Sequence, residues 1–411
     1  MKILRLPAYF EPEQMASSHL WKDLAETIAK EGIETVVYAP FPTRGISVET
    51  RRVYKKKKLE CRYDGLLVIH RFGLFGEGKN PVVRAFRYFL QSLIQFNRGI
   101  GAQDALSCNV MLIVSTPPIQ GAMAALIKRF RRDHIPFVYS LQDIFPDSLV
   151  GSGLAKKGGL LWKIGRALEN FTYQNADRII VISEDFKKNI MAKGVPEEKI
   201  EVIYNWVDEK AVLPVEKDKN PMYEEFGLDR EKFTLVYAGN LGNAQNISII
   251  LDAAFMLPGV QFALFGTGGL ENEIRSRIDS EGLSNVFLHP LQPIERVSQV
   301  YSLGDACIVS CKSGLGGSAM PSKTWTIMSC GRPVIANFDE GELEKILEKN
   351  YCGLFSHAGD LQEFVEAIKK LATNPDRCVE MGKNARRFIE EKMTKDVGTK
   401  KYINVIKSFD K

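Results

Sequence analysis

The chain has 411 residues, of which 45% are hydrophobic and 26% are charged. This balance is typical of a globular protein, and no apolar run reaches the roughly 18–20 residues that a helix needs to cross a bilayer. The net charge of +5 is uneven, because residues 1–200 carry +10 and residues 201–411 carry −5. The first half therefore favours an anionic partner or an anionic membrane surface.

The seven cysteines form no C-x-x-C pair and have no histidines at metal-ligand spacing. Such scattered thiols are expected to be reduced, which predicts a cytoplasmic protein without a structural metal. The first residues, 1–7, are too short an apolar stretch for a signal peptide and predict a first strand.

Short apolar runs alternate with amphipathic segments along the whole chain. Runs rich in Val and Ile, which is typical of buried parallel strands, fall at 2–6, 34–39, 66–70, 110–115, 137–141 and 178–183, then at 233–238, 260–265, 286–289, 306–310 and 333–336. Segments with helical character include 17–31, 118–133, 158–175, 247–256 and 270–281. The alternation predicts an α/β protein with parallel sheets.

The alternation runs twice, with an interruption near 207–231 that contains Pro214, Pro221 and many charges. We therefore predict two doubly wound, Rossmann-like domains, 1–205 and 206–390, joined by a linker in that stretch. In such folds ligands bind beyond the carboxyl ends of the strands, so a central crevice is the expected site.

In the first domain, the segment 81–98 is amphipathic, rich in aromatic and basic residues, and free of acids. Arg51, Arg52 and the lysines 55–58 precede it. These features favour an interfacial helix on an anionic membrane, and an ordinary core-facing helix is the alternative. One basic tract without a recognisable binding module does not indicate a nucleic-acid partner.

Three titratable residues of the first domain are candidates for chemistry. Asp143 and Asp147 follow the strand at 137–141 and are placed to orient acceptor hydroxyls or to act as a base, with helix capping as the alternative for Asp147. His19 lies near the first loop, where a structural role is the alternative.

In the second domain, two neighbouring strands end in glycine turns, Gly239-Asn240-Leu241-Gly242 and Gly266-Thr267-Gly268-Gly269. Glycine lets the backbone approach a ligand, and the helix that follows each turn favours an anion. Further on, Pro321 and Ser322 are typical of a helix start, which places Lys323 in the first turn. The helix dipole disfavours a cation there, so the lysine indicates a shared anion.

These motifs, with 328–336 (Met-Ser-Cys-Gly-Arg-Pro-Val-Ile-Ala), resemble the landmarks of retaining GT-B glycosyltransferases of the large family that builds bacterial surface polysaccharides. The opening loop at 9–14 and the segments at 176–183 and 202–208 are similar to the same family, so the resemblance covers nearly the whole chain. It extends to the branch that includes N-acetyl-fucosamine transferases of O-antigen synthesis.

The resemblance implies a nucleotide-sugar donor, with UDP as the expected carrier, bound by the second domain, and an acceptor bound by the first. The acceptor is expected to be a saccharide or a polyprenyl-diphosphate-saccharide reached at the inner face of the plasma membrane. No cofactor or metal is implied. The last helix, about 391–411, is expected to pack against the first domain.

Together, the residues and the resemblance predict a set of site residues in three roles. The catalytic candidates are Lys323, Asp143 and His19. The donor-binding candidates are Gly239, Asn240, Gly242, Gln245, Gly266, Gly268, Ser318, Pro321, Ser322 and Thr326. The acceptor-binding candidates are Glu13, Gln14, Ser17 and Asp147.

The sequence departs from the family at three places. Ser318 and Thr326 stand where the family has the two glutamates of an E-x7-E motif, and Asn240, Gln245 and Asn246 occupy the region of its Arg and Lys pair. Two alternatives therefore remain: a nucleotide-sugar 2-epimerase of the same fold, and a partner subunit that binds a nucleotide sugar without turnover. The epimerase should carry more acids and histidines around the crevice than this sequence shows.

Overall fold

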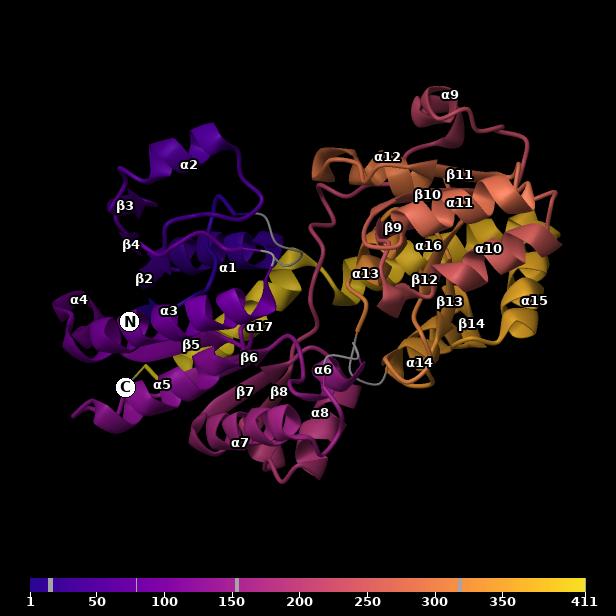
Figure 1. Ribbon diagram of the computed structural model, residues 1–411. Coiled ribbons are helices and arrows are strands. Elements are labelled where there is room, and N and C mark those ends of the chain that lie inside the picture. The colour runs from indigo at the N-terminus through magenta and orange to yellow at the C-terminus, as the bar shows by residue number, and fades with distance from the viewer. Residues whose placement is uncertain (14–17, 79, 152–154, 317–319, 411) are drawn as a thin grey trace. The chain divides into compact units, whose positions relative to one another are not determined.

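The computed structural model describes residues 1–13, 18–78, 80–151, 155–316 and 320–410 (Figure 1). The chain divides into two compact units. Unit 1 comprises Met1–Tyr204 with Gly398–Lys411, and unit 2 comprises Asn205–Val397. Both are α/β, and each has a sheet of its own.

Unit 1 is built on an eight-stranded sheet in the order β3-β4-β2-β1-β5-β6-β7-β8. Its strands are β1 (Lys2–Arg5), β2 (Glu34–Pro40), β3 (Leu59–Arg62), β4 (Leu67–Phe72), β5 (Val110–Val114), β6 (Phe137–Leu141), β7 (Arg178–Val181) and β8 (Ile200–Val202). All pairs are parallel except β3 with β4. The two edge strands, β3 and β8, were not predicted, because they are short and only partly buried and lack the continuous apolar run of a central strand.

The helical segments of unit 1 are α1 (Ser18–Lys30), α2 (Val48–Tyr54), α3 (Pro81–Gly101), α4 (Gln103–Leu106), α5 (Ile119–Phe130), α6 (Asp147–Gly151), α7 (Leu160–Asn175), α8 (Glu184–Ala192) and η1 (Glu197–Lys199). The last helix of the chain, α17 (Lys395–Lys407), joins them, since the chain returns to unit 1 at Gly398. Tyr402 of α17 packs edge to face on Trp21 of α1 and shares a 2.8 Å hydrogen bond with Ser140 of β6.

Unit 2 is built on a six-stranded, fully parallel sheet in the order β11-β10-β9-β12-β13-β14. Its strands are β9 (Thr234–Asn240), β10 (Gln261–Thr267), β11 (Val286–His289), β12 (Ala306–Ser310), β13 (Val334–Phe338) and β14 (Gly353–His357). Its helical segments are η2 (Lys217–Lys219), α9 (Met222–Glu225), η3 (Asn243–Gln245), α10 (Ile247–Met256), α11 (Glu271–Glu281), η4 (Ile294–Arg296), α12 (Val297–Ser302), α13 (Lys323–Ser329), α14 (Glu342–Lys349), α15 (Leu361–Ala372) and α16 (Pro375–Lys392).

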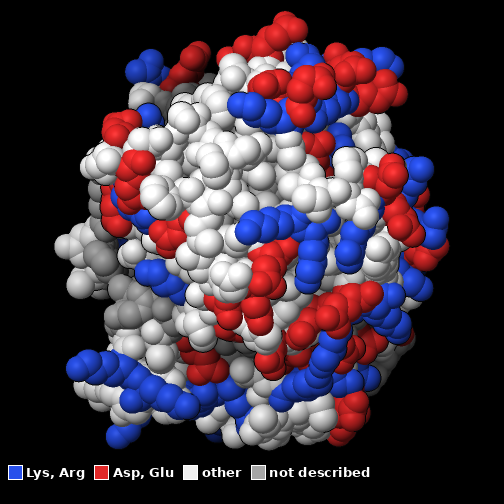
Figure 2. Space-filling view, turned by 90° about the vertical axis from the view of Figure 1, so that its right-hand side faces the viewer, with Lys and Arg blue, Asp and Glu red and all other residues white. Residues whose placement is uncertain are grey.

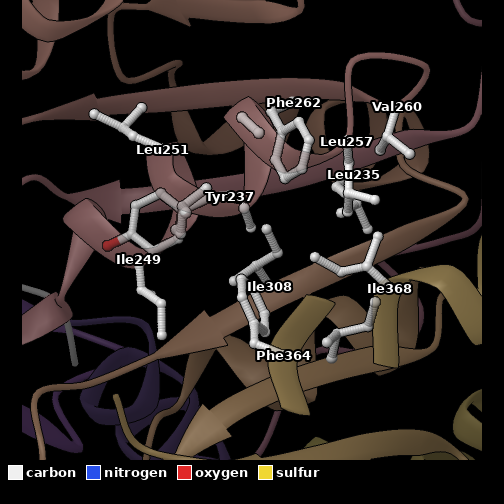
Figure 3. Packing of buried hydrophobic residues seen from close by; sticks show 14 of the residues in the cluster. Leu235, Tyr237, Ile249, Leu251, Leu257, Val260, Phe262, Ile308, Phe364 and Ile368 are labelled. Carbon is white, nitrogen blue, oxygen red and sulfur yellow. The ribbon is translucent and has the colours of Figure 1, made fainter. Parts of the chain in front are cut away.

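The core of unit 2 is formed by side chains of the central strands and of the helices that cover them (Figure 3). Leu235 and Tyr237 of β9, Phe262 of β10 and Ile308 of β12 are buried together with residues of α10 and α15. On the face that Figure 2 shows, the basic and acidic residues are interspersed.

The predicted linker at 207–231 is wrong, because this stretch belongs to unit 2. The boundary falls at Tyr204 and Asn205. Met222 and Tyr223 are buried, and the backbone N–H of Val215 donates to Ser302 Oγ at 3.0 Å. The prolines and charges of this stretch interrupt regular structure, but its apolar side chains still pack.

Both units are doubly wound, as the sequence predicted. In each sheet the strand order reverses at one place, between β1 and β5 in unit 1 and between β9 and β12 in unit 2. Open α/β sheets bind ligands beyond the carboxyl ends of the strands at such a point. In the part of the chain that the structure describes, no helix has both the length and the hydropathy needed to cross a membrane.

Candidate active site

The loops after β9 and β12 meet where the strand order of unit 2 reverses. Ser310 Oγ donates to the carbonyl of Gln245 at 2.6 Å, and the N–H of Lys312 donates to the carbonyl of Ala244 at 2.9 Å. Because these two contacts join the loops, the turn at Gly239–Gly242 is held beside the segment that leads to α13.

Lys323 is the first residue of α13 and reaches back to the β9 turn. Its Nζ lies 4.0 Å from the ring centroid of Tyr237, and a Cβ added to Gly239 would lie 2.9 Å from that Nζ. Gly239 has a φ of +148°, which L side chains rarely adopt. Glycine at this position therefore both permits the backbone conformation and leaves room for the ammonium group.

The ammonium of Lys323 forms no ion pair with the described residues. Its contact is with the face of the Tyr237 ring. Burial lowers the pKa of Lys323 to about 8. A cation that is partly withdrawn from water and lacks a counter-ion is a favourable place for a bound anion.

The side chains of the first glycine turn form a small amide pair. Asn240 Nδ2 donates to Gln245 Oε1 at 3.2 Å, and a Cβ on Gly242 would lie 2.5 Å from that same Nδ2. The predicted donor-binding residues Asn240, Gly242 and Gln245 are thus brought together. The pair fixes the turn that precedes α10.

Gly266 and Gly268 pack closely against the β9 turn, and their predicted donor-binding role stays a prediction. A Cβ on Gly266 would meet the carbonyl of Gly239 at 2.5 Å, and a Cβ on Gly268 would meet the carbonyl of Leu241 at 2.3 Å. The N–H of Leu241 also donates to the carbonyl of Thr267 at 2.9 Å. The space that these two glycines leave is therefore filled by the β9 turn.

The remaining donor candidates lie around the start of α13. Ser322 is the N-cap residue but its side chain makes no capping bond, and Pro321 precedes it. Thr326 lies three residues after Lys323, so the two side chains share one face of the helix. Ser318 lies outside the described residues.

Asp339 is a site residue that the sequence analysis missed. Its carboxylate accepts the N–H groups of Gly314 and Gly316 at 3.0 and 2.7 Å and so shapes the loop after β12. The available signal was its position directly after β13, because polar residues at the carboxyl end of a strand reach the site of an α/β fold.

A larger cavity of unit 2, about 740 Å³, lies at the amino ends of the strands, away from the glycine turns at their carboxyl ends. Its walls include Phe233 before β9, Asp305 before β12 and Arg332 before β13, but neither Lys323 nor the glycine turns. Much of its positive charge is already used, since Arg386 donates to the carbonyls of Glu209, Val212 and Ser329. Size alone therefore does not make it the donor site.

In unit 1, Asp143 follows β6 and is held by its backbone. Its N–H and that of Gln142 donate to Ser115 Oγ at 3.3 and 3.0 Å, so Ser115 is a further residue that the sequence did not indicate. Asp143 is exposed as a whole, yet neighbouring groups displace enough water to raise the pKa of its carboxyl, against a hydrogen bond from Ser148. The direction of the shift suits a residue that exchanges protons.

Asp147 belongs to an ion-pair network, and the acceptor role predicted for it stays a prediction. Its carboxylate contacts Arg166 at 3.2 Å and Lys193 at 2.7 Å. The same two cations pair with Glu169, whose carboxylate also accepts from Tyr173. With both oxygens engaged, Asp147 ties α6 to α7.

Glu13 is likewise used by the protein itself. One oxygen accepts the N–H groups of Thr43 and Arg44 at 2.7 and 2.9 Å, and the other accepts the N–H of Phe10. Burial raises the pKa of Glu13, and these amides oppose the shift. The residue lines a cavity but serves to shape the loop after β1, because its oxygens are occupied.

The structure does not test the other first-domain candidates. His19 is an exposed residue in the first turn of α1. Gln14 and Ser17 lie outside the described residues. Their predicted roles stay predictions.

Several solved structures share the architecture of this chain. HepE of Anabaena in complex with UDP gives a TM-score of 0.74 at 16% identity, covering 99% of this chain and 100% of HepE. Sucrose-phosphate synthase from Thermosynechococcus elongatus gives 0.77 at 14% identity, covering 99% and 98%. WaaG, a glycosyltransferase involved in lipopolysaccharide biosynthesis, gives 0.71 at 12% identity, covering 99% of both chains. At these identities the likeness establishes the fold, which is GT-B.

Sequence comparison assigns both halves of the chain. Residues 18–211 match the model of Glycosyltransferase Family 4, and residues 218–388 match that of Glycosyl transferases group 1. The fold is therefore GT-B, and models of glycosyltransferases match both halves of the chain.

Curated relatives of this GT-B protein carry related names. It is 26% identical over 220 residues to the probable glycosyltransferase WbjE of Pseudomonas aeruginosa, covering 53% of this chain and 55% of WbjE. It is 26% identical over 279 residues to the putative colanic acid biosynthesis glycosyl transferase WcaI of Escherichia coli K12, covering 66% and 67%. The matches thus span about half to two thirds of the relatives' length.

In this GT-B protein, the turn after β9, the joined loop after β12 and the start of α13 form one structure. It presents a partly buried ammonium beside a glycine-containing backbone. Such an arrangement binds phosphate oxygens, because a fixed cation compensates their charge in a place that water reaches poorly.

Proposed function

We propose that the protein is a retaining glycosyltransferase that transfers a sugar from a nucleotide sugar, with UDP as the carrier, to a saccharide acceptor in bacterial surface polysaccharide synthesis. The observation that carries the proposal is Lys323, whose ammonium lies beside the Gly239 turn and has no counter-ion among the described residues. The two glycosyltransferase models and the names of WbjE and WcaI support it.

The proposed chemistry follows from that cation. The bond between the anomeric carbon and the diphosphate oxygen breaks, and an acceptor hydroxyl oxygen bonds to the same face of that carbon. The hydroxyl proton passes to the departing phosphate oxygen, which gives UDP and a glycoside. Lys323 binds the diphosphate more strongly as negative charge develops on it, so it stabilises the transition state more than the bound donor.

Retention without a protein nucleophile fits the residues of this chain. Ser318 and Thr326 occupy the positions of the two family glutamates. A threonine hydroxyl binds a ribose hydroxyl more weakly than a carboxylate does. The proposal therefore assigns the charge compensation to Lys323, with no resident metal, and gives Asp143 the task of orienting the acceptor.

The proposed acceptor is a lipid-diphosphate-linked saccharide, which unit 1 reaches at an anionic membrane. Helix α3 supports this proposal because its faces are inverted relative to an ordinary surface helix. Arg87, Gln91 and Gln95 are fully buried, and Gln95 donates to the carbonyls of Pro7 and Tyr38. The apolar residues one turn apart on the other face are exposed, namely Val82 (75%), Phe86 (55%), Phe89 (47%) and Leu93 (44%).

The helices next to α3 extend the same surface chemistry. Helix α5 contacts both α3 and α7. The large exposed apolar side chains of α5 and α7 are Leu126, Phe130, Leu160, Leu161 and Ile164. The sequence has no acid in 81–103, 105–132 or 148–168, but it has several cations. Apolar side chains among cations are what an anionic lipid surface binds.

Binding and turnover assays test the proposal. Isothermal titration of the full chain with UDP, and then with several UDP-sugars, should show binding of UDP. A turnover assay with a polyprenyl-diphosphate-saccharide should yield UDP and an elongated lipid, with and without EDTA, and the new linkage should keep the donor's anomeric configuration. Failure of UDP to bind would refute the donor assignment.

The non-acidic Ser318 and Thr326 favour a second candidate, a subunit that binds a nucleotide sugar without turnover. That candidate predicts UDP binding with no product for any acceptor. Epimerisation of the UDP-sugar in the absence of acceptor would instead identify a 2-epimerase. Inversion of the anomeric configuration would overturn only the retaining mechanism.

A further inference from the structure

A small cavity of about 110 Å³ lies in unit 1, where the strand order of the sheet reverses. Its walls come from the ends of β1, β5 and β6 and from α1 and α5, through Arg5, Val114, Gln142, Trp21 and Gln120. The volume is sufficient for several waters or for one phosphate or carboxylate group. Its position is the one at which open α/β sheets bind ligands.

Arg5 is the charged residue of this wall that lacks a hydrogen-bonding partner. It is 2% exposed, and its guanidinium carbon lies 5.2 Å from the ring centroid of Trp21 and 5.8 Å from that of Phe10. Among the described residues no oxygen accepts a hydrogen bond from it, and its Nη1 is buried and unpaired. The rings contact the faces of the cation but offer no acceptor to its N–H groups.

The other buried arginines that the structure describes in unit 1 are bonded. Arg131 donates to the carbonyls of Ala105 and Leu106 and pairs with Asp133. Arg71 donates to the carbonyl of Glu11, and Arg87 donates to that of Phe75. Arg71 and Arg87 also have buried nitrogens without a partner, but each donates at least one hydrogen bond, whereas Arg5 donates none to the described residues. A buried guanidinium without an acceptor is costly unless a ligand supplies one.

The two acids in the cavity wall do not neutralise Arg5. Glu13 accepts three backbone N–H groups, and Glu11 pairs with Arg62 at 2.6 Å. Burial lowers the pKa of Arg5 to about 10, against the charge of Glu11 and the influence of Tyr402. The guanidinium therefore keeps its charge at neutral pH.

Gln120 brings a second polar group to the same wall, a side-chain oxygen that can accept a hydrogen bond. Its Nε2 donates to Gln95 Oε1 at 3.0 Å, but its buried Oε1 receives no hydrogen bond in the described structure. The cavity therefore offers a cationic donor at Arg5 and an amide acceptor at Gln120. A sugar that carries an oxyanion matches both, because its charged group fits the cavity and accepts from the guanidinium, and a hydroxyl next to that group donates to the amide.

We propose that Arg5 and Gln120 form a recognition site for an acceptor sugar that bears an oxyanion, either a carboxylate or a phosphate. The naming of this ligand as the acceptor rests on the proposed function, whereas oxyanion binding by the cavity does not. The donor assignment to unit 2 is independent of it.

The first experiment measures binding of glucuronic acid, glucose 6-phosphate and uncharged glucose to the full chain without donor, by isothermal titration. The two charged sugars should bind more tightly than glucose, and the tighter of the two identifies the oxyanion. Arg5→Met should weaken the charged sugars at least about tenfold, the scale of one lost charge-assisted hydrogen bond. Arg5→Lys should retain part of the affinity. Equal binding of glucose and the charged sugars, or no binding of either charged sugar, would overturn the proposal.

Thermal melting separates recognition from a structural role. Arg5→Met should melt no lower than wild type, because the variant removes an unpaired buried cation. Arg131→Met is the matched control: it should melt lower, since Arg131 bonds two carbonyls and Asp133, and it should bind the charged sugars normally. An Arg5→Met variant that binds charged sugars like wild type would refute the site, whatever its melting temperature.

Parallel titration with UDP keeps the two proposals distinct. UDP binding should be the same in wild type and Arg5→Met. If UDP binds and sugar is transferred while no oxyanion binds the cavity, the recognition site fails and the proposed function stands. If the charged sugars bind and UDP does not, the proposed function fails and the oxyanion site stands.

Discussion

At the scale of single residues, two cations of the protein are positioned to bind an anionic ligand. Lys323 lies beside Gly239 and the ring of Tyr237, and Arg5 lies between Phe10 and Trp21. Neither has an anionic partner in the structure as described. By contrast, the acids Glu13 and Asp147 are saturated by the protein, so charge alone does not identify a functional residue.

Replacing Lys323 tests its role in charge compensation. Lys323→Ala should lower turnover by on the order of 100-fold or more, the scale of one lost transition-state contact. UDP affinity should fall by less, and the protein without ligand should melt no lower than wild type, because the lysine is uncompensated there. Lys323→Arg, which keeps the charge, should retain more turnover than Lys323→Ala. Near-normal turnover of the alanine variant would remove Lys323 from the site.

The pH dependence of UDP binding gives a second test at this residue. In the free protein, burial lowers the pKa of Lys323 to about 8, and a bound diphosphate should raise this pKa. UDP therefore prefers the protonated lysine: its affinity should be full below about pH 8 and fall as the pH rises above it, by up to about tenfold per unit. Titration between pH 7.5 and 9.5 measures this, and Lys323→Gln should be flat over that range. A wild-type affinity independent of pH would contradict the assignment.

At the scale of elements, α3 shows how one helix serves two environments. Its polar side chains enter the interior of unit 1, where Gln91 and Gln95 bond backbone carbonyls of the strand and loop beneath. Its apolar side chains consequently face outward. An exposed apolar face among cations is unfavourable in water and favourable at a lipid interface.

A liposome assay tests this face. Wild type should sediment with anionic vesicles at low salt and be released at high salt, since the attraction between exposed charges is screened. A Phe86→Ser and Phe89→Ser double variant should lose binding and keep UDP affinity. Phe255→Ser is the control, because Phe255 is an equally large exposed side chain that belongs to unit 2. Equal sedimentation of all three proteins would exclude α3 as the contact.

At the scale of the whole molecule, the chain builds two units, each with its own sheet and core, and passes between them twice. The second passage brings the end of α17 back to unit 1, where Tyr402 is buried against Trp21 and Ser140. The stability of unit 1 therefore depends on residues from both ends of the chain.

Tyr402→Ala tests this dependence. Loss of a buried aromatic side chain should destabilise unit 1 by about 3–5 kcal/mol, while UDP affinity stays unchanged because the proposed donor site lies in unit 2. Differential scanning calorimetry should show one lowered transition in the variant and one transition that UDP raises in both proteins. A variant whose transitions both equal those of wild type would contradict the prediction.

Much of the fold follows from local pattern. The buried central strands were predicted because a parallel strand covered on both faces reads as a continuous apolar run. The position of Lys323 at a helix start followed from Pro321 and Ser322. The edge strands β3 and β8 were missed because their residues are too few and too exposed to give that pattern.

The sequence by itself indicated the α/β class, the glycine turn at Gly239 and the helix start that carries Lys323, since each depends on local pattern along the chain; the approach of Lys323 to Gly239 came from the tertiary structure. Only the tertiary structure decided that Asp147 pairs with Lys193 and Glu13 with Thr43, and that Arg5 lies beside Phe10 and Trp21 in the wall of a cavity. The physical reason is that partners, and their absence, arise from packing between segments distant in sequence. A charged residue becomes structural or available for a ligand only when that packing is complete.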